Sequence, residues 1–189
     1  LNSDFTVELS NNNVTVHSVD HDLDWEVTLA YTGEHTMTGA RIARAAERYL
    51  GDTEHFAVTY GDGLTDADLS EEFDYHLANK KIGTILGVNP PSRFGEIKLE
   101  KNRVKEFIEK PDFVDEWING GYFFFHRDFL KYLTKKESCV LERKPLVELA
   151  KDEQLNMYKH KYFWACMDTQ RDRDYLTKLW ESGEAPWKT

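Results

Sequence analysis

The feature that most constrains this fold is an alternation, from residue 38 onward, of short apolar segments with amphipathic segments of helical period. Apolar runs bounded by Gly, Pro or Asp are typical of buried strands. The pattern predicts helices over 38–50, 68–77, 128–133, 145–150 and 169–183, strands over 55–60, 82–88, 120–125, 155–159 and 162–167, and a hairpin over 96–100 and 103–108. Strands that alternate with helices in this way predict a three-layer α/β fold with a mixed central sheet.

The first part of the chain has a different pattern, with a period of two. Apolar and polar side chains alternate over 5–9, 14–16 and 25–29, and three consecutive Asn residues at 11–13 are typical of a turn. This predicts a small antiparallel β region beside the central sheet. No repeat, low-complexity segment or Pro/Gly-rich linker divides the sequence, so we expect a single domain over 1–189.

Composition excludes several classes of partner. The 189 residues include 24 Lys and Arg against 34 Asp and Glu, for a net charge of −10. Nucleic acid is excluded as the main partner, because its phosphate backbone requires a basic face, whereas a small phosphate ligand requires only a few local cations. No apolar run approaches the length of a membrane span, so we expect no membrane partner and no signal peptide. Two cysteines without CxxC spacing favour reduced thiols and a cytoplasmic location.

Two carboxylates at predicted strand ends are the first candidates for chemistry. Asp62 lies in Tyr-Gly-Asp-Gly after the strand at 55–60, and Asp168 lies between the strand at 162–167 and the last helix. In open α/β sheets ligands collect beyond the carboxyl ends of the strands, and Mg²⁺ is held by one or two carboxylates together with substrate phosphates. A plain turn at Asp62 and an N-cap at Asp168 are the alternative interpretations.

Three further segments combine charge or glycine with a strand or helix end. Glu109-Lys110 ends the predicted hairpin, where a sugar-binding Glu and a phosphate-binding Lys compete with a surface ion pair. Asn119-Gly120 brings backbone close to a ligand or forms a turn. The segment from Thr36 to Arg41 opens a helix, whose N-terminus favours anions; a simple cap with a solvated Arg is the alternative.

Asp66 and Asp68 match the D-x-D pattern of metal-dependent glycosyltransferases. Asp68, however, also precedes a helical segment with Glu71 three residues later, which is a capping-box arrangement. Capping accounts for Asp68 without a metal. A glycosyltransferase nevertheless stays an alternative function.

The order of these motifs resembles the sugar-phosphate nucleotidylyltransferases, most of all those that transfer a cytidylyl group to glucose 1-phosphate. The resemblance covers nearly the whole chain and includes the ending Trp-Glu-Ser-Gly-Glu-Ala-Pro-Trp-Lys at 180–188. The motifs that carry it are Thr-Met-Thr-Gly-Ala-Arg at 36–41, Tyr-Gly-Asp-Gly at 60–63, Arg-Phe-Gly at 93–95, Glu-Lys-Pro at 109–111, Ile-Asn-Gly-Gly at 118–121 and Met-Asp-Thr at 167–169.

The resemblance implies a Rossmann-like nucleotide-diphospho-sugar transferase fold and a Mg²⁺-dependent reaction of CTP with glucose 1-phosphate that gives CDP-glucose and pyrophosphate. It implies that CDP-glucose supplies dideoxysugars for surface polysaccharide such as the lipopolysaccharide O-antigen, and that the protein is a homo-oligomer. The implied roles are metal ligands for Asp62 and Asp168, nucleotide contacts for Thr36, Arg41 and Gly61, sugar-phosphate contacts for Glu109, Lys110, Asn119 and Gly120, and catalysis by Arg41 and Lys110.

One departure from the family is large. Family members begin with a strand and a loop of the form L-A-G-G-x-G-T-R followed by a Lys, which cradles the triphosphate, and no stretch in 1–35 matches it. We therefore expect that an N-terminal nucleotide-binding portion is absent and that this chain alone is inactive. A relative that uses UTP or dTTP and a non-catalytic sugar-phosphate-binding module stay open as alternatives.

Overall fold

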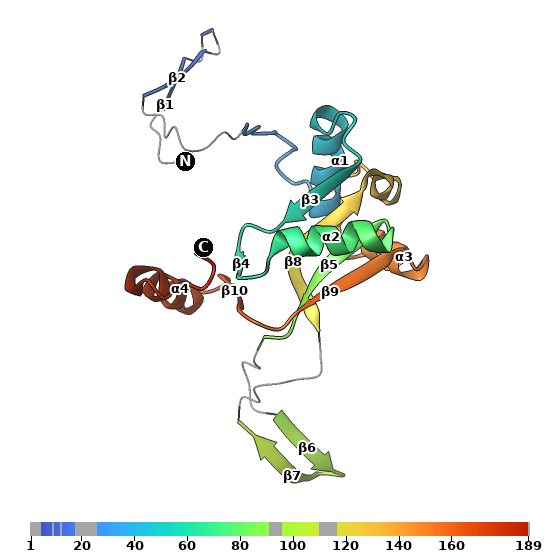
Figure 1. Ribbon diagram of the computed structural model, residues 1–189, viewed down its shortest axis with the longest axis vertical. Coiled ribbons are helices and arrows are strands. Elements are labelled where there is room, and N and C mark those ends of the chain that lie inside the picture. Colours follow the sequence, from blue (N-terminus) through green and yellow to red (C-terminus); the bar gives the residue numbers. More distant parts are fainter. Residues whose placement is uncertain are drawn as a thin grey trace. The chain divides into compact units, whose positions relative to one another are not determined.

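The computed structural model describes residues 5–8, 10–11, 13–17, 26–90, 96–109 and 117–188, and the chain divides into two compact units, Leu1–Tyr31 and Thr32–Thr189 (Figure 1). In the first unit, β1 (Phe5–Glu8) pairs antiparallel with β2 (Asn13–Val16), with Thr6 opposite Thr15. This confirms the antiparallel region. That residues 1–189 form one catalytic domain stays a prediction.

The strand expected over 25–29 is not present in its described part. Residues 26–30 have no regular secondary structure, and Val27 and Leu29 are exposed by 54% and 87%. Trp25 lies outside the described residues. Alternation marks a strand only where a partner strand and a core cover one face, and here the apolar side chains face solvent.

The second unit is built on a four-stranded sheet with the order β3 (His55–Thr59), β8 (Ile118–His126), β5 (Gly83–Val88) and β9 (Leu155–His160). The central strand β8 is antiparallel to both of its neighbours, whereas β5 and β9 are parallel. The sheet is therefore mixed, as the sequence predicts.

Helices cover both faces of this sheet, and the phenylalanines of β8 show how. Phe123 and Phe125 point to one face, where they pack in the core with Leu141 and Leu149 beside α1 (Thr38–Tyr49), the 3₁₀ helix η1 (Arg127–Tyr132) and α3 (Lys144–Lys151). Phe124 points to the other face, where its ring lies 5.1 Å from that of Phe73 in α2 (Leu69–Asn79). Successive strand side chains point to opposite faces, so both must be covered. The three-layer α/β architecture is confirmed.

Two small antiparallel pairs complete the unit. β4 (Gly63–Thr65) pairs with β10 (Trp164–Cys166), and β6 (Glu96–Glu100) pairs with β7 (Arg103–Ile108) as the expected hairpin. The last helix, α4 (Gln170–Ser182), begins at a capping box in which Thr169 and Asp172 bond each other's backbone N–H groups, and it ends at Gly183 with φ +75°.

Helix α2 buries two titratable side chains against the sheet. Glu72 is fully buried, neither of its carboxylate oxygens has a hydrogen-bond partner, and burial raises its pKa to about 8. His76 is 1% exposed and shares hydrogen bonds with Thr84 (2.9 Å) and His55 (3.0 Å). Burial, followed by the neighbouring His55 and His126, lowers the pKa of His76 to about 4, so it is neutral at physiological pH.

Candidate functional site

The structure brings together the segments that carry Asp62 and Asp168. Asp62 lies in the turn between β3 and β4, and the backbone N–H of Met167 donates to its carbonyl oxygen at 2.8 Å. The antiparallel pairing of β4 with β10, which sets Gly63 opposite Cys166, extends this contact (Figure 1). Both Asp residues are exposed, and the Cys166 thiol donates to the Asp168 carboxylate at 3.1 Å. Of the two predicted metal ligands, Asp62 therefore takes part in this backbone hydrogen bond and Asp168 is the next residue after its donor.

The oxygen ligands that Asp62 and Asp168 offer suit a hard divalent cation better than a softer metal. Within the described residues no group of three or more His, Cys, Asp and Glu side chains could hold a metal ion alone. Mg²⁺ suits such an incomplete set, because it keeps several waters and takes its other oxygen ligands from a bound phosphate. Asp62 and Asp168 would hold the ion. Neither Cys139 nor Cys166 is part of a disulfide.

Tyr60 anchors the turn that carries Asp62. Its backbone N–H donates to the carbonyl of Gly121 at 3.0 Å, and its hydroxyl donates to the Glu142 carboxylate. Glu142 also accepts a hydrogen bond from the Thr38 hydroxyl, at 3.2 Å, in the first turn of α1. Burial, and then Glu142, raise the pKa of the Tyr60 phenol, so this phenol stays a donor. The network ties the end of β3 to the start of α1.

Asn119 and Gly120 lie beside this turn, at the start of β8. The Asn119 side-chain oxygen accepts from the backbone N–H of Gly121 at 2.8 Å, and the Gly120 carbonyl accepts from the Trp164 indole at 2.8 Å. A Cβ on Gly120 would lie 3.0 Å from the Leu86 carbonyl oxygen, so sheet packing already requires a glycine there. Their role as sugar contacts stays a prediction.

Thr36 and Arg41 lie in one hydrogen-bonded turn before and at the start of α1. The Arg41 guanidinium donates to the Thr32 hydroxyl (2.9 Å) and to the Glu34 carbonyl (3.2 Å). Thr36 is 3% exposed, and its hydroxyl accepts from Arg44 at 2.9 Å. The Thr36 hydroxyl therefore has a structural partner, whereas the Arg41 side chain is exposed.

Two candidates and one motif belong to the segment around the hairpin. Glu109 follows β7 directly and is exposed. Lys110 and the Arg-Phe-Gly motif at 93–95 lie outside the described residues. Their predicted roles stay predictions.

The D-x-D pair has structural partners instead. Asp68 is the N-cap of α2 and accepts from the backbone N–H groups of Ser70 and Glu71 at 2.8 and 3.2 Å, which confirms the capping interpretation. Asp66 pairs with the buried His160 at 2.7 Å. Both contacts weigh against a glycosyltransferase metal site.

Sequence reasoning missed three of the residues that shape this site. Thr38 and Glu142 form hydrogen bonds with groups that lie more than 80 positions away along the chain. The Arg44 guanidinium likewise donates to the distant Lys135 carbonyl, at 2.8 Å. Such contacts leave no local pattern. The sequence offers one weak signal, because Glu142 is a carboxylate three positions before a predicted helix that begins at Pro145.

Comparisons with known proteins show what the chain is similar to. The sequence profile described as "Nucleotidyl transferase" matches residues 7–177. The chain is 41% identical over 187 residues to the glucose-1-phosphate cytidylyltransferase of Salmonella typhi. The aligned region covers 99% of this chain and 72% of that protein. It is 31% identical to the mannose-1-phosphate guanylyltransferase of Mycobacterium tuberculosis, over 75% of this chain and 41% of that protein.

A solved structure has the same fold. HddC from Yersinia pseudotuberculosis matches with a TM-score of 0.61 at 17% identity, over 85% of this chain and 70% of that one.

In the part of the chain that the structure describes, no helix has the length and apolar character needed to cross a bilayer.

Proposed function

Because the chain belongs to the nucleotidyl transferase family, we propose that it transfers a cytidylyl group from CTP to glucose 1-phosphate, releasing pyrophosphate and forming CDP-glucose. The observation that carries the proposal is the backbone contact between Met167 and Asp62, because it brings together the two segments that carry the exposed Asp62 and Asp168. The 41% identity to the Salmonella typhi enzyme supports the choice of substrates.

The reaction forms one bond and breaks one. A phosphate oxygen of glucose 1-phosphate attacks the α-phosphorus of CTP, and the bond from that phosphorus to the bridging oxygen breaks, so pyrophosphate leaves with the bonding electrons. A bound Mg²⁺ supplies positive charge that offsets the charge on the phosphoryl oxygens. Asp62 and Asp168 would hold that ion, while Tyr60 and Glu142 fix the turn that positions Asp62.

The remaining site residues bind and orient the substrates. Arg41 and Lys110 are assigned to the phosphoryl groups, because fixed cations stabilise developing charge in the transition state. Thr36 and Gly61 are assigned to the nucleotide, Glu109 to the sugar hydroxyls, and Asn119 and Gly120 to the sugar pocket. The exposed Arg41 side chain and the open space around Gly61 support these assignments.

The proposal extends to the setting of the reaction. CDP-glucose would feed dideoxysugar synthesis for surface polysaccharide such as an O-antigen. We place the protein in the cytoplasm as a homo-oligomer. The family resemblance supports this setting, and the absence of a disulfide at Cys139 and Cys166 agrees with a reducing compartment.

The test is pyrophosphate release by the intact protein with glucose 1-phosphate, Mg²⁺ and each of CTP, UTP and dTTP. We expect turnover with CTP and a much lower rate with the other two nucleotides. Turnover of UTP or dTTP without CTP would overturn the assignment of the base. No turnover with any nucleotide would overturn the proposed reaction.

The carboxylates give a sharper prediction. Asp62→Ala and Asp168→Ala should each lower kcat by at least about a hundredfold, because each removes charge that offsets the transition state. Asp66→Ala is the matched control: it breaks the pair with His160 and lowers the unfolding temperature, but kcat should stay within a few-fold of wild type. Loss of activity in Asp66→Ala together with full activity in Asp168→Ala would favour a glycosyltransferase.

A further inference from the structure

A cavity lies on the face of the sheet that α1, η1 and α3 cover. Most of its lining residues come from the segment between the start of η1 and the first turns of α3. Its volume is about 700 Å³, within the range of pockets that hold small molecules. Neither Asp62 nor Asp168 lines it. We call it the η1–α3 pocket; its charged lining residues are Asp128, Lys131, Lys136, Arg143, Lys144 and Glu148.

The charge of this pocket is opposite to that of the chain. Four of these residues are cations and two are carboxylates, whereas the whole chain has 24 basic and 34 acidic residues. Clustered cations in a hollow concentrate positive potential there. An acidic protein that gathers cations around one cavity has a surface suited to an anion.

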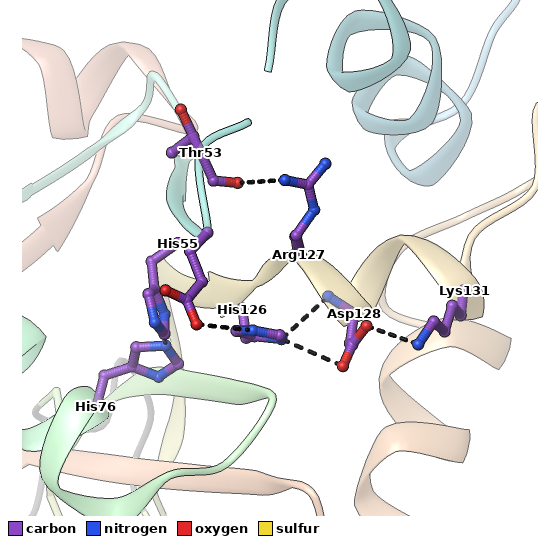
Figure 2. Close-up of polar contacts among 8 residues, drawn as sticks. Thr53, His55, His76, His126, Arg127, Asp128 and Lys131 are labelled. Carbon is purple, nitrogen blue, oxygen red and sulfur yellow. Dashed lines mark hydrogen bonds and ion pairs between the residues drawn. The ribbon is translucent and has the colours of Figure 1, made fainter. Parts of the chain in front are cut away.

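Both carboxylates of the pocket already have cationic partners. Figure 2 shows the Asp128 carboxylate between Lys131, at 2.6 Å, and His126, at 3.4 Å. Glu148 lies 3.7 Å from Lys144 in the first turns of α3. For Lys136 and Arg143, the described part of the chain shows no ion pair. The uncompensated charge of the pocket therefore resides on these two side chains.

The donors around this charge suit a phosphate group. Arg143 can present two parallel N–H groups to phosphate oxygens, Lys136 adds a point charge, and Thr134 and Ser138 add hydroxyl donors to the lining. The pocket also includes the start of α3, whose N-terminal end favours negative charge. The volume suits a mononucleotide or a hexose phosphate better than a lone ion.

The same segment that lines this pocket supports the candidate active site. The Glu137 and Cys139 carbonyls accept from the backbone N–H groups of Met37 (2.9 Å) and Ala40 (3.2 Å) at the start of α1. Glu142, next to Arg143, bonds Thr38 and Tyr60. A ligand that moves Arg143 therefore acts on a segment fixed to α1 and to the turn that carries Asp62.

We propose that the η1–α3 pocket binds a phosphate-bearing small molecule at a site separate from Asp62 and Asp168. Segment 136–143 couples this site to the candidate active site. The binding part is independent of the proposed function, whereas the coupling part rests on it.

Binding is tested by titration calorimetry of the intact protein in EDTA, with inorganic phosphate, glucose 1-phosphate and CTP as separate probes. The Lys136→Ala/Arg143→Ala variant should bind the preferred probe at least tenfold more weakly than wild type, and affinity should fall as salt rises. Lys151→Ala is the matched control, because it removes a cation of α3 outside the pocket and should not change affinity.

Three outcomes would overturn the site. They are no binding of any probe, equal affinity in the wild type and the double variant, and binding that is lost only in Asp62→Ala/Asp168→Ala. All five substituted residues are exposed, and thermal melts that match wild type establish that each variant is folded.

Coupling is tested in the pyrophosphate assay. Adding the preferred probe should change the rate of the wild type at least twofold and leave the double variant unchanged. The same change in both proteins would overturn the coupling, because the probe would then act at the active site. If the intact protein has no activity with any nucleotide, the proposed function fails while the calorimetric result still decides the site.

Discussion

Two glycines near Tyr60 differ in what the fold requires of them. Gly121 has φ +80°, and a Cβ there would lie 2.9 Å from the Tyr60 ring. Gly61 lies outside the left-handed region, and a Cβ there would meet nothing within 4 Å. The fold therefore requires glycine at 121 but not at 61. At 61 the open space is available to a ligand.

This contrast gives a prediction at the scale of single residues. Gly61→Ala should leave the unfolding temperature unchanged and raise the KM for the nucleotide about tenfold, because a methyl group would stand where the nucleotide approaches the backbone. Gly121→Ala should lower the free energy of unfolding by at least about 1 kcal/mol, because it forces a left-handed alanine against Tyr60. Thermal melts and steady-state kinetics distinguish the two, and an unchanged KM in Gly61→Ala would remove the nucleotide assignment.

Among single residues, the sequence predicts those that end an element and misses those that bridge elements. Asp62 and Asp168 were predicted because both follow apolar strands, and the β4–β10 pairing brings the segments that carry them together. Glu142 and Arg44 act on partners far along the chain, so no spacing rule finds them. Glu72 illustrates the same limit, because a helical carboxylate next to Glu71 is expected to face solvent, yet it is fully buried.

At the scale of elements, local signals predict most of the helices and strands. The helix over 38–50, the hairpin and the capped final helix all agree with the structure to within a few residues. β4 was missed because it has only three residues and exists through its pairing with β10. The run at 25–29 was wrong in its described part because alternation there has no partner strand.

Helix α2 allows a prediction at this scale. Asp68→Ala should lower the free energy of unfolding by about 1 kcal/mol, because it leaves the Ser70 and Glu71 N–H groups without their capping oxygen. Asp74→Ala, an exposed position within the same helix, is the control and should change stability by less than about 0.5 kcal/mol. Urea unfolding measures both. Equal losses would mean that the cap does not stabilise α2.

At the scale of the whole molecule, the buried Glu72 makes stability depend on pH. In the folded state Glu72 keeps its proton up to a pH of about 8, because burial raises its pKa, whereas the unfolded chain releases that proton near the ordinary pKa of 4.5. The folded state thus binds more protons between these values, and stability falls as pH rises through this window. Below pH 4.5 Glu72 is protonated in both the folded and the unfolded state, and none of this stability is lost.

Glu72→Gln should remove this alkaline loss. Relative to the variant, wild type should lose roughly 2 to 4 kcal/mol of unfolding free energy between pH 5 and pH 8, measured by urea unfolding at each pH. The acid range of the two stability profiles is an internal control that does not involve Glu72. Burial lowers the pKa of His76 to about 4, so both proteins lose stability as pH falls below 6.5. Parallel profiles across the whole range would show that Glu72 is not buried as described.

The pairing of β4 with β10 also sets the order in which the site can arise during synthesis. Strands β3, β5 and β8 all precede residue 127, so a nascent chain can pair them early. β4 has to wait for β10, which follows every strand of the four-stranded sheet along the chain, and until then Asp62 lacks its backbone contact with Met167. Chains fold from the N-terminus as they emerge. We therefore expect a ribosome-bound intermediate to hold a partly formed sheet in which the segments that carry Asp62 and Asp168 have not yet come together.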